Sequence, residues 1–261
     1  MSLKHKTSFV KPNDVSNDRF LGKKLEILQP KKGFRAGIDS VLLGASVVRG
    51  VKKLADFGAG VGVASFCALK NNAGLSATLI ENNLDMLELA KENIVKNGFE
   101  GRSETLELDL TSQGKVRQIA GLKNNYFDCI IANPPFFDMA KGSLAKGKAR
   151  ADARQMDFEN LEKWVKTAAS CAASGGEVIF IFHVSGFLPL LNAFEGRFGN
   201  IDILPIISKE GQDAKRFLLR GIKGSKAPLK IKSPLVLHAK EGREFLPQVE
   251  AIFRGEDVLH W

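Results

Sequence analysis

The chain has little of what a membrane, disulfide-rich or metal-binding protein requires. Its three cysteines, Cys67, Cys129 and Cys171, lie far apart in apolar patterns, so we expect reduced core side chains rather than disulfides or metal ligands. The four histidines show no ligand spacing, and no apolar run approaches the length of a membrane span. The polar, lysine-bearing start of the chain does not read as a secretory signal. We therefore expect a cytoplasmic protein with no metal and no membrane partner, and the sequence does not specify an oligomeric state.

Positive charge is not spread evenly along the chain, although the net charge is +9. Basic side chains exceed acidic ones by six in residues 1–35, by four in 141–154 and by six in 208–232. A merely solvated lysine surface would disperse this charge. Clustered Lys and Arg favour a phosphate backbone, and hence a nucleic acid partner. The residues from which we expect phosphate contacts are Lys141, Lys146, Arg150, Arg154, Arg216 and Arg220.

Apolar strand patterns alternate with amphipathic helix patterns along most of the chain. We expect strands at 53–57, 76–81, 103–108, 127–132, 176–182 and 200–207, and helices at 61–71, 83–97, 158–173 and 185–197. This alternation predicts an α/β fold with a doubly wound, mostly parallel sheet of seven strands. The short strands at 217–219 and 235–237 are expected to form an antiparallel C-terminal hairpin. We expect one domain over residues 31–261, after an N-terminal arm over residues 1–30 that leads into a short strand at 24–28.

Ligand-type residues follow four of the expected strands. The first strand carries Asp56 and runs into the glycine-rich turn Gly58-Ala59-Gly60-Val61-Gly62, and the next three end near Glu81, Asp109 and Asn133. Glycines let the backbone approach a ligand closely, and an acid at the end of the second strand can hold ribose hydroxyls. Because open α/β sheets bind small molecules at the carboxyl ends of their strands, we expect these residues to share one site. The glycine spacing disfavours a nicotinamide dehydrogenase.

The tetrapeptide Asn133-Pro134-Pro135-Phe136 comes directly after the fourth strand. Two consecutive prolines donate no backbone hydrogen bonds, so they end the strand in an extended turn. The asparagine keeps its side-chain carbonyl free as an acceptor. A rigid pair of carbonyl acceptors beside an aromatic ring suits a planar amide or aromatic amine, which has two N–H protons to donate. The alternative is a simple proline-rich turn between a strand and a helix.

These motifs together resemble those of Rossmann-like methyltransferases that use S-adenosylmethionine. The chain is most similar to the branch that methylates the exocyclic amine of adenine 37 in bacterial valine tRNA, and the likeness extends to residues 18–22, 29–43 and 234–238. The resemblance implies that the cofactor contacts Asp39, Asp56, Gly58, Ala59, Gly60, Gly62, Glu81, Asn82, Asp109 and Leu110. It also implies that the acceptor is handled by Asn133, Pro134, Pro135 and Phe136.

The same resemblance implies a role for each group of residues. The glycine turn would admit the methionine moiety, Glu81 would hold the ribose and Asp109 would meet the adenine amine. The Asn133 side chain and the Pro134 carbonyl would accept the protons of the target amine, while Phe136 would stack on the extruded base. Some of these residues also have a structural explanation. Asp56 could bond local backbone N–H groups, Asp39 is first expected to cap a helix, and Phe136 could be a core aromatic.

Three functions remain open on the sequence. The first is an adenine-amine methyltransferase acting on RNA, with a tRNA anticodon loop as the expected substrate. The second is a protein glutamine-amide methyltransferase of the release-factor type, because an amide and an aminopurine present the same pair of N–H donors. The third is an RNA-binding module that retains the fold without catalysis. Phe136 and the clustered basic charge favour nucleic acid, and the set of cofactor-type residues favours catalysis.

Overall fold

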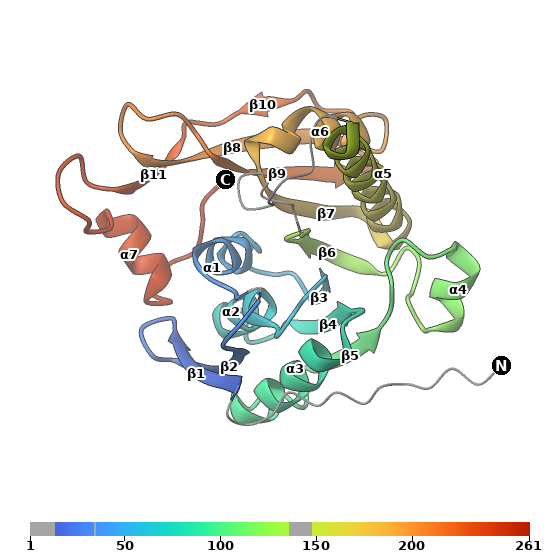
Figure 1. The fold of residues 1–261 in the computed structure, drawn as a ribbon, viewed down its shortest axis with the longest axis horizontal. Coiled ribbons are helices and arrows are strands. Elements are labelled where there is room, and N and C mark those ends of the chain that lie inside the picture. Colours follow the sequence, from blue (N-terminus) through green and yellow to red (C-terminus); the bar gives the residue numbers. More distant parts are fainter. Residues whose placement is uncertain (1–13, 34, 136–147) are drawn as a thin grey trace.

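The computed structural model describes residues 14–33, 35–135 and 148–261, and only the backbone of residues 148–157. One large sheet runs through the molecule with helices on both of its faces (Figure 1). Its main strands are β3 (Lys53–Phe57), β4 (Ser76–Glu81), β5 (Ser103–Glu107), β6 (Phe127–Ala132), β7 (Ala172–His183), β8 (Phe198–Lys209) and β9 (Arg216–Lys223).

These seven strands lie in the order β5-β4-β3-β6-β7-β9-β8. Strands β3 to β7 pair in parallel, whereas β9 is antiparallel to both of its neighbours, β7 and β8. The predicted doubly wound, mostly parallel sheet is confirmed. Two short strands, β10 (Lys230–Ile231) and β11 (Leu235–His238), pair in parallel with β8 at the edge.

The helices are distributed over the two faces of the sheet, and each face has its own buried cluster. Strand side chains alternate between the clusters, as the two-residue period of a strand requires. In β7, Ile179 and Ile181 belong to one cluster, and Val178 and Phe180 to the other. The helices are α1 (Ile38–Ala45), α2 (Val63–Asn71), α3 (Leu84–Lys96), α4 (Gly114–Ile119), α5 (Lys148–Cys171), α6 (Phe187–Phe194) and α7 (Pro247–Phe253), with a 3-10 turn at Val184–Gly186.

The predicted pairing of residues 217–219 with 235–237 is wrong. Strand β9, which contains the first segment, forms a hairpin with β8 and inserts between β8 and β7. Only residues 210–215 separate β8 from β9, and so short a connection favours antiparallel neighbours. Strand β11 instead lies on the other side of β8, parallel to it. The basic stretch between β9 and β11 therefore crosses to the outer edge of the sheet.

Most of the expected N-terminal arm is part of the folded body. Residues 15–30 form a hairpin of β1 (Val15–Phe20) and β2 (Leu25–Pro30). Leu25 and Ile27 are 1% and 0% exposed and belong to the same cluster as α1 and α2. Strand β2 thus contributes to the core through alternate side chains, within the segment for which we predict an arm.

Two asparagines of α3 fix β2 in place through its backbone. The Asn93 amide accepts from the Leu28 N–H at 2.7 Å and donates to the Leu28 and Val61 carbonyls, each at 3.1 Å. One turn later, Asn97 accepts from the Glu26 N–H at 3.0 Å and donates to the Glu26 carbonyl at 2.8 Å. Residues four apart on a helix share a face, and residues two apart on a strand share an edge. The two amides therefore replace part of a neighbouring strand.

The three cysteines have the environment that the sequence predicts. Cys67, Cys129 and Cys171 are buried and free of disulfides. Burial raises the pKa of each thiol. They are protonated core side chains rather than reactive thiolates.

Candidate active site

A cavity of about 390 Å³, its open mouth included, lies at the carboxyl end of β3. Four of the predicted site residues share it: Asp56 at the end of the strand, Gly58 and Ala59 in the glycine turn, and Asn133 just after β6. Strands β3 and β6 are parallel neighbours, with Phe57 paired to Ala132, so the residues that follow both strands emerge side by side. The complete lining is Gln29, Ala36, Ser40, Asp56, Gly58, Ala59, Val61, Ala64, Met86 and Asn133.

The three glycines of the turn have different structural reasons to be glycine, although all have positive φ. A Cβ at Gly58 would lie 2.5 Å from the Trp164 ring, and one at Gly62 would lie 2.6 Å from the Phe66 ring. The packing around these two positions therefore leaves no room for a side chain. Gly60, at φ +55°, would carry a Cβ with nothing within 4 Å. Gly60 does not line the cavity itself, but it lies between Ala59 and Val61, which do, so a ligand could approach its backbone closely.

Glu81, at the end of β4, holds this turn through hydrogen bonds. Its Oε2 accepts from the Gly60 N–H at 2.9 Å, and its Oε1 accepts from the N–H groups of Asn82 and Asn83 at 3.0 and 2.9 Å. A carboxylate offers about four acceptor positions. Glu81 therefore ties the glycine turn to the start of α3 and retains acceptor capacity for a hydroxyl.

Asp56 is 2% exposed and serves as a local backbone acceptor, the structural explanation that the sequence leaves open. Its Oδ2 accepts from the Ser65 N–H at 3.2 Å and from the Ser65 hydroxyl at 2.8 Å. Burial raises the pKa of Asp56 to about 7, the Ser65 hydrogen bonds oppose this shift, and the Glu81 charge adds to it. Because Asp56 also lines the cavity, contact with a ligand remains compatible with its structural role.

Asp109 and Leu110 follow β5, the neighbour of β4 in the sheet. The Asp109 Oδ1 accepts from the Thr111 N–H and hydroxyl, both at 2.8 Å, which shapes the turn after the strand. Leu110 is 3% exposed, and its carbonyl accepts from the Thr167 hydroxyl at 2.9 Å. Neither residue lines the cavity, so their cofactor contacts, like that of Asn82, remain predictions.

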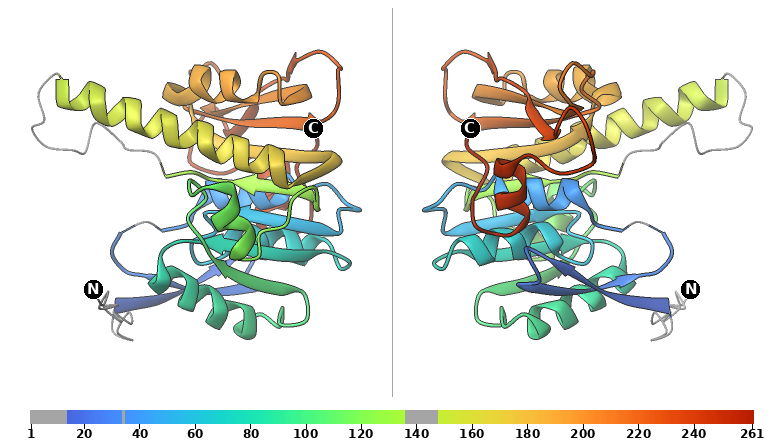
Figure 2. Two further views of the ribbon diagram at one scale, coloured as in Figure 1. Left: turned by 90° about the vertical axis from the view of Figure 1, so that its right-hand side faces the viewer. Right: turned by 90° about the vertical axis from the view of Figure 1, so that its left-hand side faces the viewer.

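The acceptor tetrapeptide is described as far as Pro135. Asn133 is half-buried and lines the cavity, Pro134 is buried and Pro135 is exposed. Phe136, Lys141 and Lys146 lie outside the described residues. The backbone of α5 carries Arg150 and Arg154 on the part of this helix that extends beyond the body of the molecule (Figure 2).

The sequence predicts that Asp39 caps α1, but Asp39 is not the N-cap residue of this helix. The N-cap position is Gly37, and Asp39 lies in the first turn of the helix, where it pairs with Arg216 at the start of β9. The cap prediction fails because the backbone turns into the helix two residues before the aspartate. Arg216, whose side chain is 38% exposed, keeps a solvent-facing part next to the cavity residue Ser40 and its helix.

The phosphate contact predicted at Arg220 requires correction. Its guanidinium is 12% exposed, pairs with the buried Asp202 and lies near Glu177. The Trp261 ring covers it, 4.4 Å from the guanidinium carbon. A charge already neutralised and covered inside the protein gains little from phosphate. Arg220 therefore binds β8, β9 and the C-terminal segment together.

Sequence reasoning missed the wall of the cavity that precedes α1. Gln29, 1% exposed, accepts from the Ala36 N–H at 2.8 Å and donates to the Asp18 carboxylate at 2.7 Å. Arg35 pairs with the same carboxylate. This network bends the chain between β2 and α1 so that Ala36 and Ser40 face the cavity. Its local signal, a polar residue near the end of an alternating apolar strand, does not by itself indicate a cavity wall.

The described part of the chain contains neither a membrane-spanning helix nor a cluster of metal ligands. No helix there is both long and apolar enough to cross a membrane. No group of three or more His, Cys, Asp or Glu side chains among residues 14–33, 35–135 and 148–261 is arranged to hold a metal ion.

The molecule has a doubly wound sheet, a glycine turn and Asn133 at one cavity, and an acidic residue that ends the next strand and holds the glycine turn, as expected for S-adenosylmethionine-dependent methyltransferases. A sequence model of the family described as methyltransferase small domain matches residues 39–209. The chain belongs to this family.

Individual relatives agree with this family assignment. The chain is 28% identical over 204 residues to a tRNA1(Val) (adenine(37)-N6)-methyltransferase of Flavobacteriaceae bacterium (strain 3519-10), covering 78% of this chain and 75% of the relative. It is 29% identical over 209 residues to the protein of that name from Shewanella frigidimarina, covering 77% and 79%. Its fold is similar to the crystal structure of a predicted O-methyltransferase, Atu636 from Agrobacterium tumefaciens, with a TM-score of 0.73 and 29% identity over 85% of this chain and 98% of that one.

The described residues fit the cofactor of this class. The free space at Gly60 admits a ligand against the backbone, and Glu81 offers carboxylate oxygen beside it. The cavity walls combine apolar Met86 and Val61 with polar Ser40 and Asp56. This mixture suits a molecule that combines a flat adenine and a ribose with a positively charged sulfonium and a charged amino-acid end.

Proposed function

We propose that the protein methylates the exocyclic amine of an adenine in RNA and that the anticodon loop of a tRNA is its substrate. The observation that carries the proposal is the position of Asn133, which lines one cavity with Gly58 and Ala59 of the cofactor turn. An amine held at Asn133 would lie at the cofactor site without any large rearrangement of the sheet. The names of the relatives from Flavobacteriaceae and Shewanella support the same acceptor.

S-adenosylmethionine supplies the methyl group, carried on a sulfonium ion. The residues of the chain then have to bind the cofactor and align the acceptor amine with its methyl group. The Asn133 side-chain oxygen and the Pro134 carbonyl would each accept a hydrogen bond from one N–H group of the amine, so that the nitrogen lone pair points at the methyl group. These acceptors would also stabilise the positive charge that develops on nitrogen. A neutral asparagine is sufficient because the amine can lose its proton after the transfer.

RNA would be held by positive charge around this opening. We expect part of that charge to come from Arg150 and Arg154 of α5 and from Lys141 and Lys146, which precede α5 in the sequence and lie outside the described residues. Arg216 adds a guanidinium from the start of β9, on the side of α1. Phe136 remains our candidate for the ring that stacks on the extruded adenine. An unpaired base of an anticodon loop costs little to extrude.

The decisive experiment offers the protein several acceptors at once. Isotope-labelled S-adenosylmethionine is incubated with the protein and total bacterial tRNA, and the nucleosides are separated by mass spectrometry. We expect label in N6-methyladenosine, and loss of that label when transcripts carry guanosine in place of the target adenosine. Label that is absent from RNA but present on a glutamine of a release factor, tested in parallel, would replace the proposal with the protein-amide reaction.

A further inference from the structure

An exposed surface borders the acceptor motif on the side of β7. Strands β6 and β7 are parallel neighbours, with Ala132 paired to Phe180, so the chain leaves both strands at the same edge of the sheet. His183 ends β7 and pairs with Arg216, the first residue of β9. The Val184 N–H then donates to the Lys215 carbonyl at 3.1 Å. The turn after β7 and the start of β9 thus form one continuous surface next to Asn133, which we call the β7 ledge.

Apolar side chains on this ledge face solvent without a structural need. Leu188 of α6 is 66% exposed and Val184 is 39% exposed. The same helix is fixed from its other side, since Leu190 is fully buried and the Phe187 ring meets the Phe217 ring at 5.1 Å. The helix would therefore keep its place with a polar residue at position 188.

The ledge also carries groups that suit nucleic acid. The His183 ring is oriented by Ser185, whose hydroxyl lies 2.9 Å from Nδ1 and whose N–H donates to that atom at 3.2 Å. Lys215 is exposed and Arg216 is partly so. The turn before them also contains Glu210 and Asp213, so the local excess of positive charge is small. Flat and apolar contact surfaces, rather than charge alone, distinguish this ledge.

We propose that His183, Val184, Leu188, Lys215 and Arg216, the residues of the β7 ledge, hold the RNA strand that flanks the target adenine. Unpaired bases stack on the imidazole ring of histidine and pack against neighbouring apolar side chains, while their phosphates meet Lys and Arg. A base extruded toward Asn133 leaves its neighbours at the rim of the cavity, and the ledge is the part of that rim formed by β7 and β9. The inference rests on the proposed RNA substrate and adds a specific contact surface to it.

The test measures RNA binding and methylation by the intact protein, using an anticodon stem-loop that contains the target adenine. Leu188→Ser should raise the Kd for this RNA roughly tenfold, because the apolar contact between a flanking base and this side chain is lost. It should raise the KM for RNA similarly and leave the Kd for S-adenosylmethionine unchanged. Lys215→Ala should lower the slope of log Kd against log salt by about 0.7, the value for one phosphate contact with a single strand.

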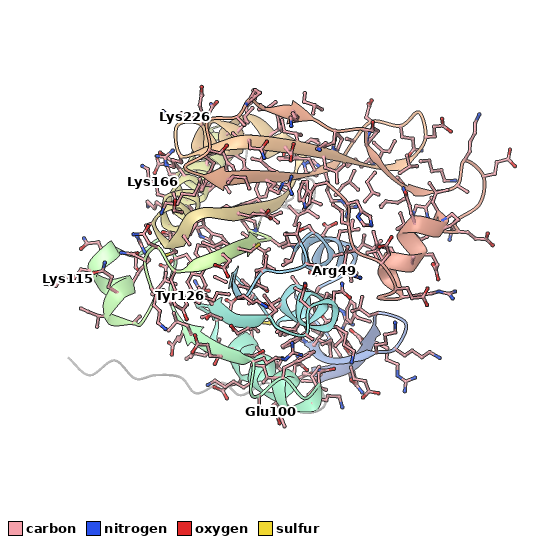
Figure 3. The ribbon with its side chains drawn as sticks, turned by 180° about the vertical axis from the view of Figure 1, so that it is seen from behind. Arg49, Glu100, Lys115, Tyr126, Lys166 and Lys226 are labelled. Carbon is pink, nitrogen blue, oxygen red and sulfur yellow. The ribbon has the colours of Figure 1, made fainter. Side chains whose placement is uncertain are left out.

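Matched controls come from α4, which lies apart from α6 in the molecule (Figures 1 and 3). Ile119→Ser removes a side chain that is 78% exposed, and Lys115→Ala removes an exposed lysine. Neither should change RNA binding. If Leu188→Ser and Lys215→Ala behave like these controls while the wild type methylates RNA, the ledge is refuted and the proposed function stands. A wild type that methylates only protein refutes both.

Discussion

The Asn133 amide lines the cavity half-buried, at the point where β6 ends. Replacing it with alanine removes one of the two proposed acceptors and leaves the glycine turn untouched. We expect Asn133→Ala to lower kcat for methyl transfer by about 10²- to 10³-fold, the range for losing one preorganised dipole. The Kd for S-adenosylmethionine, measured by calorimetry, should stay within about twofold.

The matched change at this position is Asn133→Gln, which keeps the amide but displaces it by one methylene. Transfer should again be slow, because alignment fails even though the acceptor is chemically the same. Full activity in either variant would show that the amine is held elsewhere.

Asp56 makes stability depend on pH in an identifiable window. Its pKa rises from an ordinary 3.8 to about 7 in the folded protein. Between these values the folded protein keeps a proton that the unfolded chain has released, so the free energy of unfolding falls as pH rises and levels off above about pH 7. Asp56→Asn removes this titration and retains an acceptor for Ser65. The variant should gain on the order of 2–3 kcal/mol relative to wild type between pH 5 and pH 8.

Urea denaturation at both pH values measures this difference. The comparison has to be the gap between wild type and variant, because other groups titrate identically in both proteins. A gap that stays constant from pH 5 to pH 8 would mean that Asp56 is ionised throughout, and would contradict its buried position.

At the scale of the element, the glycine turn separates folding from cofactor binding. A Cβ at Gly62 would strike the Phe66 and Leu79 side chains, whereas a Cβ at Gly60 would meet nothing within 4 Å. We therefore expect Gly62→Ala to destabilise the fold by about 2–4 kcal/mol through overpacking and a positive φ. Gly60→Ala should cost only about 1–2 kcal/mol, the penalty of the left-handed backbone alone.

Cofactor affinity should show the reverse contrast. Gly60→Ala is expected to weaken binding of S-adenosylmethionine at least tenfold, since its new methyl group would project into the open space from which we expect the cofactor to approach the turn. Thermal unfolding and calorimetry on the same samples separate the two effects. Unchanged affinity in Gly60→Ala would place the cofactor away from the turn.

The attachment of β2 to α3 is a second feature of this scale. Asn93 is fully buried and makes three hydrogen bonds to backbone groups. Asn93→Ala leaves those buried groups unpaired, so it should cost about 2–4 kcal/mol in urea denaturation. Val95→Ala, at a position that is 62% exposed on the same helix, is the control and should change stability by less than about 0.5 kcal/mol. Equal losses in both variants would reduce the asparagine to an ordinary helix position.

Sequence reasoning succeeded where a local pattern decides the structure. Strands β3, β4 and β6 have the predicted bounds because each is a short apolar run that leads into a turn with glycine, proline or a carboxylate. The prediction that β9 pairs with β11 failed, since the residue pattern of a strand does not reveal which other strand lies beside it. The hairpin β1–β2 was predicted only in part: the sequence indicates the short strand at 24–28, but no strand periodicity predicts β1 or the contact of β2 with two amides at the end of α3.

The same distinction applies to the site. Asp56, Gly58, Ala59 and Asn133 could be identified because each follows a strand, and the carboxyl ends of parallel strands converge. Gln29 could not, because its position depends on the folding of the hairpin against α3. The uneven distribution of charge indicated a nucleic acid partner, but Arg220 shows that a basic residue in a basic segment can instead be buried and paired inside the protein.

Across the whole molecule, the remaining basic side chains determine how the protein would meet RNA. Lys115, Lys166 and Lys226 extend from the outer surface in Figure 3, whereas Arg150 and Arg154 belong to the helix that extends past the body in Figure 2. Long-range attraction draws on all of them, but only charges near the opening displace counterions when the substrate is bound.

The affinities for the two ligands of this enzyme should therefore depend differently on salt concentration. With about four phosphate contacts, the affinity for tRNA is expected to fall roughly a hundredfold between 50 and 200 mM salt, whereas that for S-adenosylmethionine should change little. Fluorescence anisotropy with labelled tRNA gives the first value and calorimetry gives the second. The double variant Arg150→Ala/Arg154→Ala should flatten the salt slope by about 1.5 to 2, and Lys166→Ala should leave it unchanged. An RNA affinity that does not respond to salt would mean that base contacts alone hold the substrate, which the uneven charge of this chain argues against.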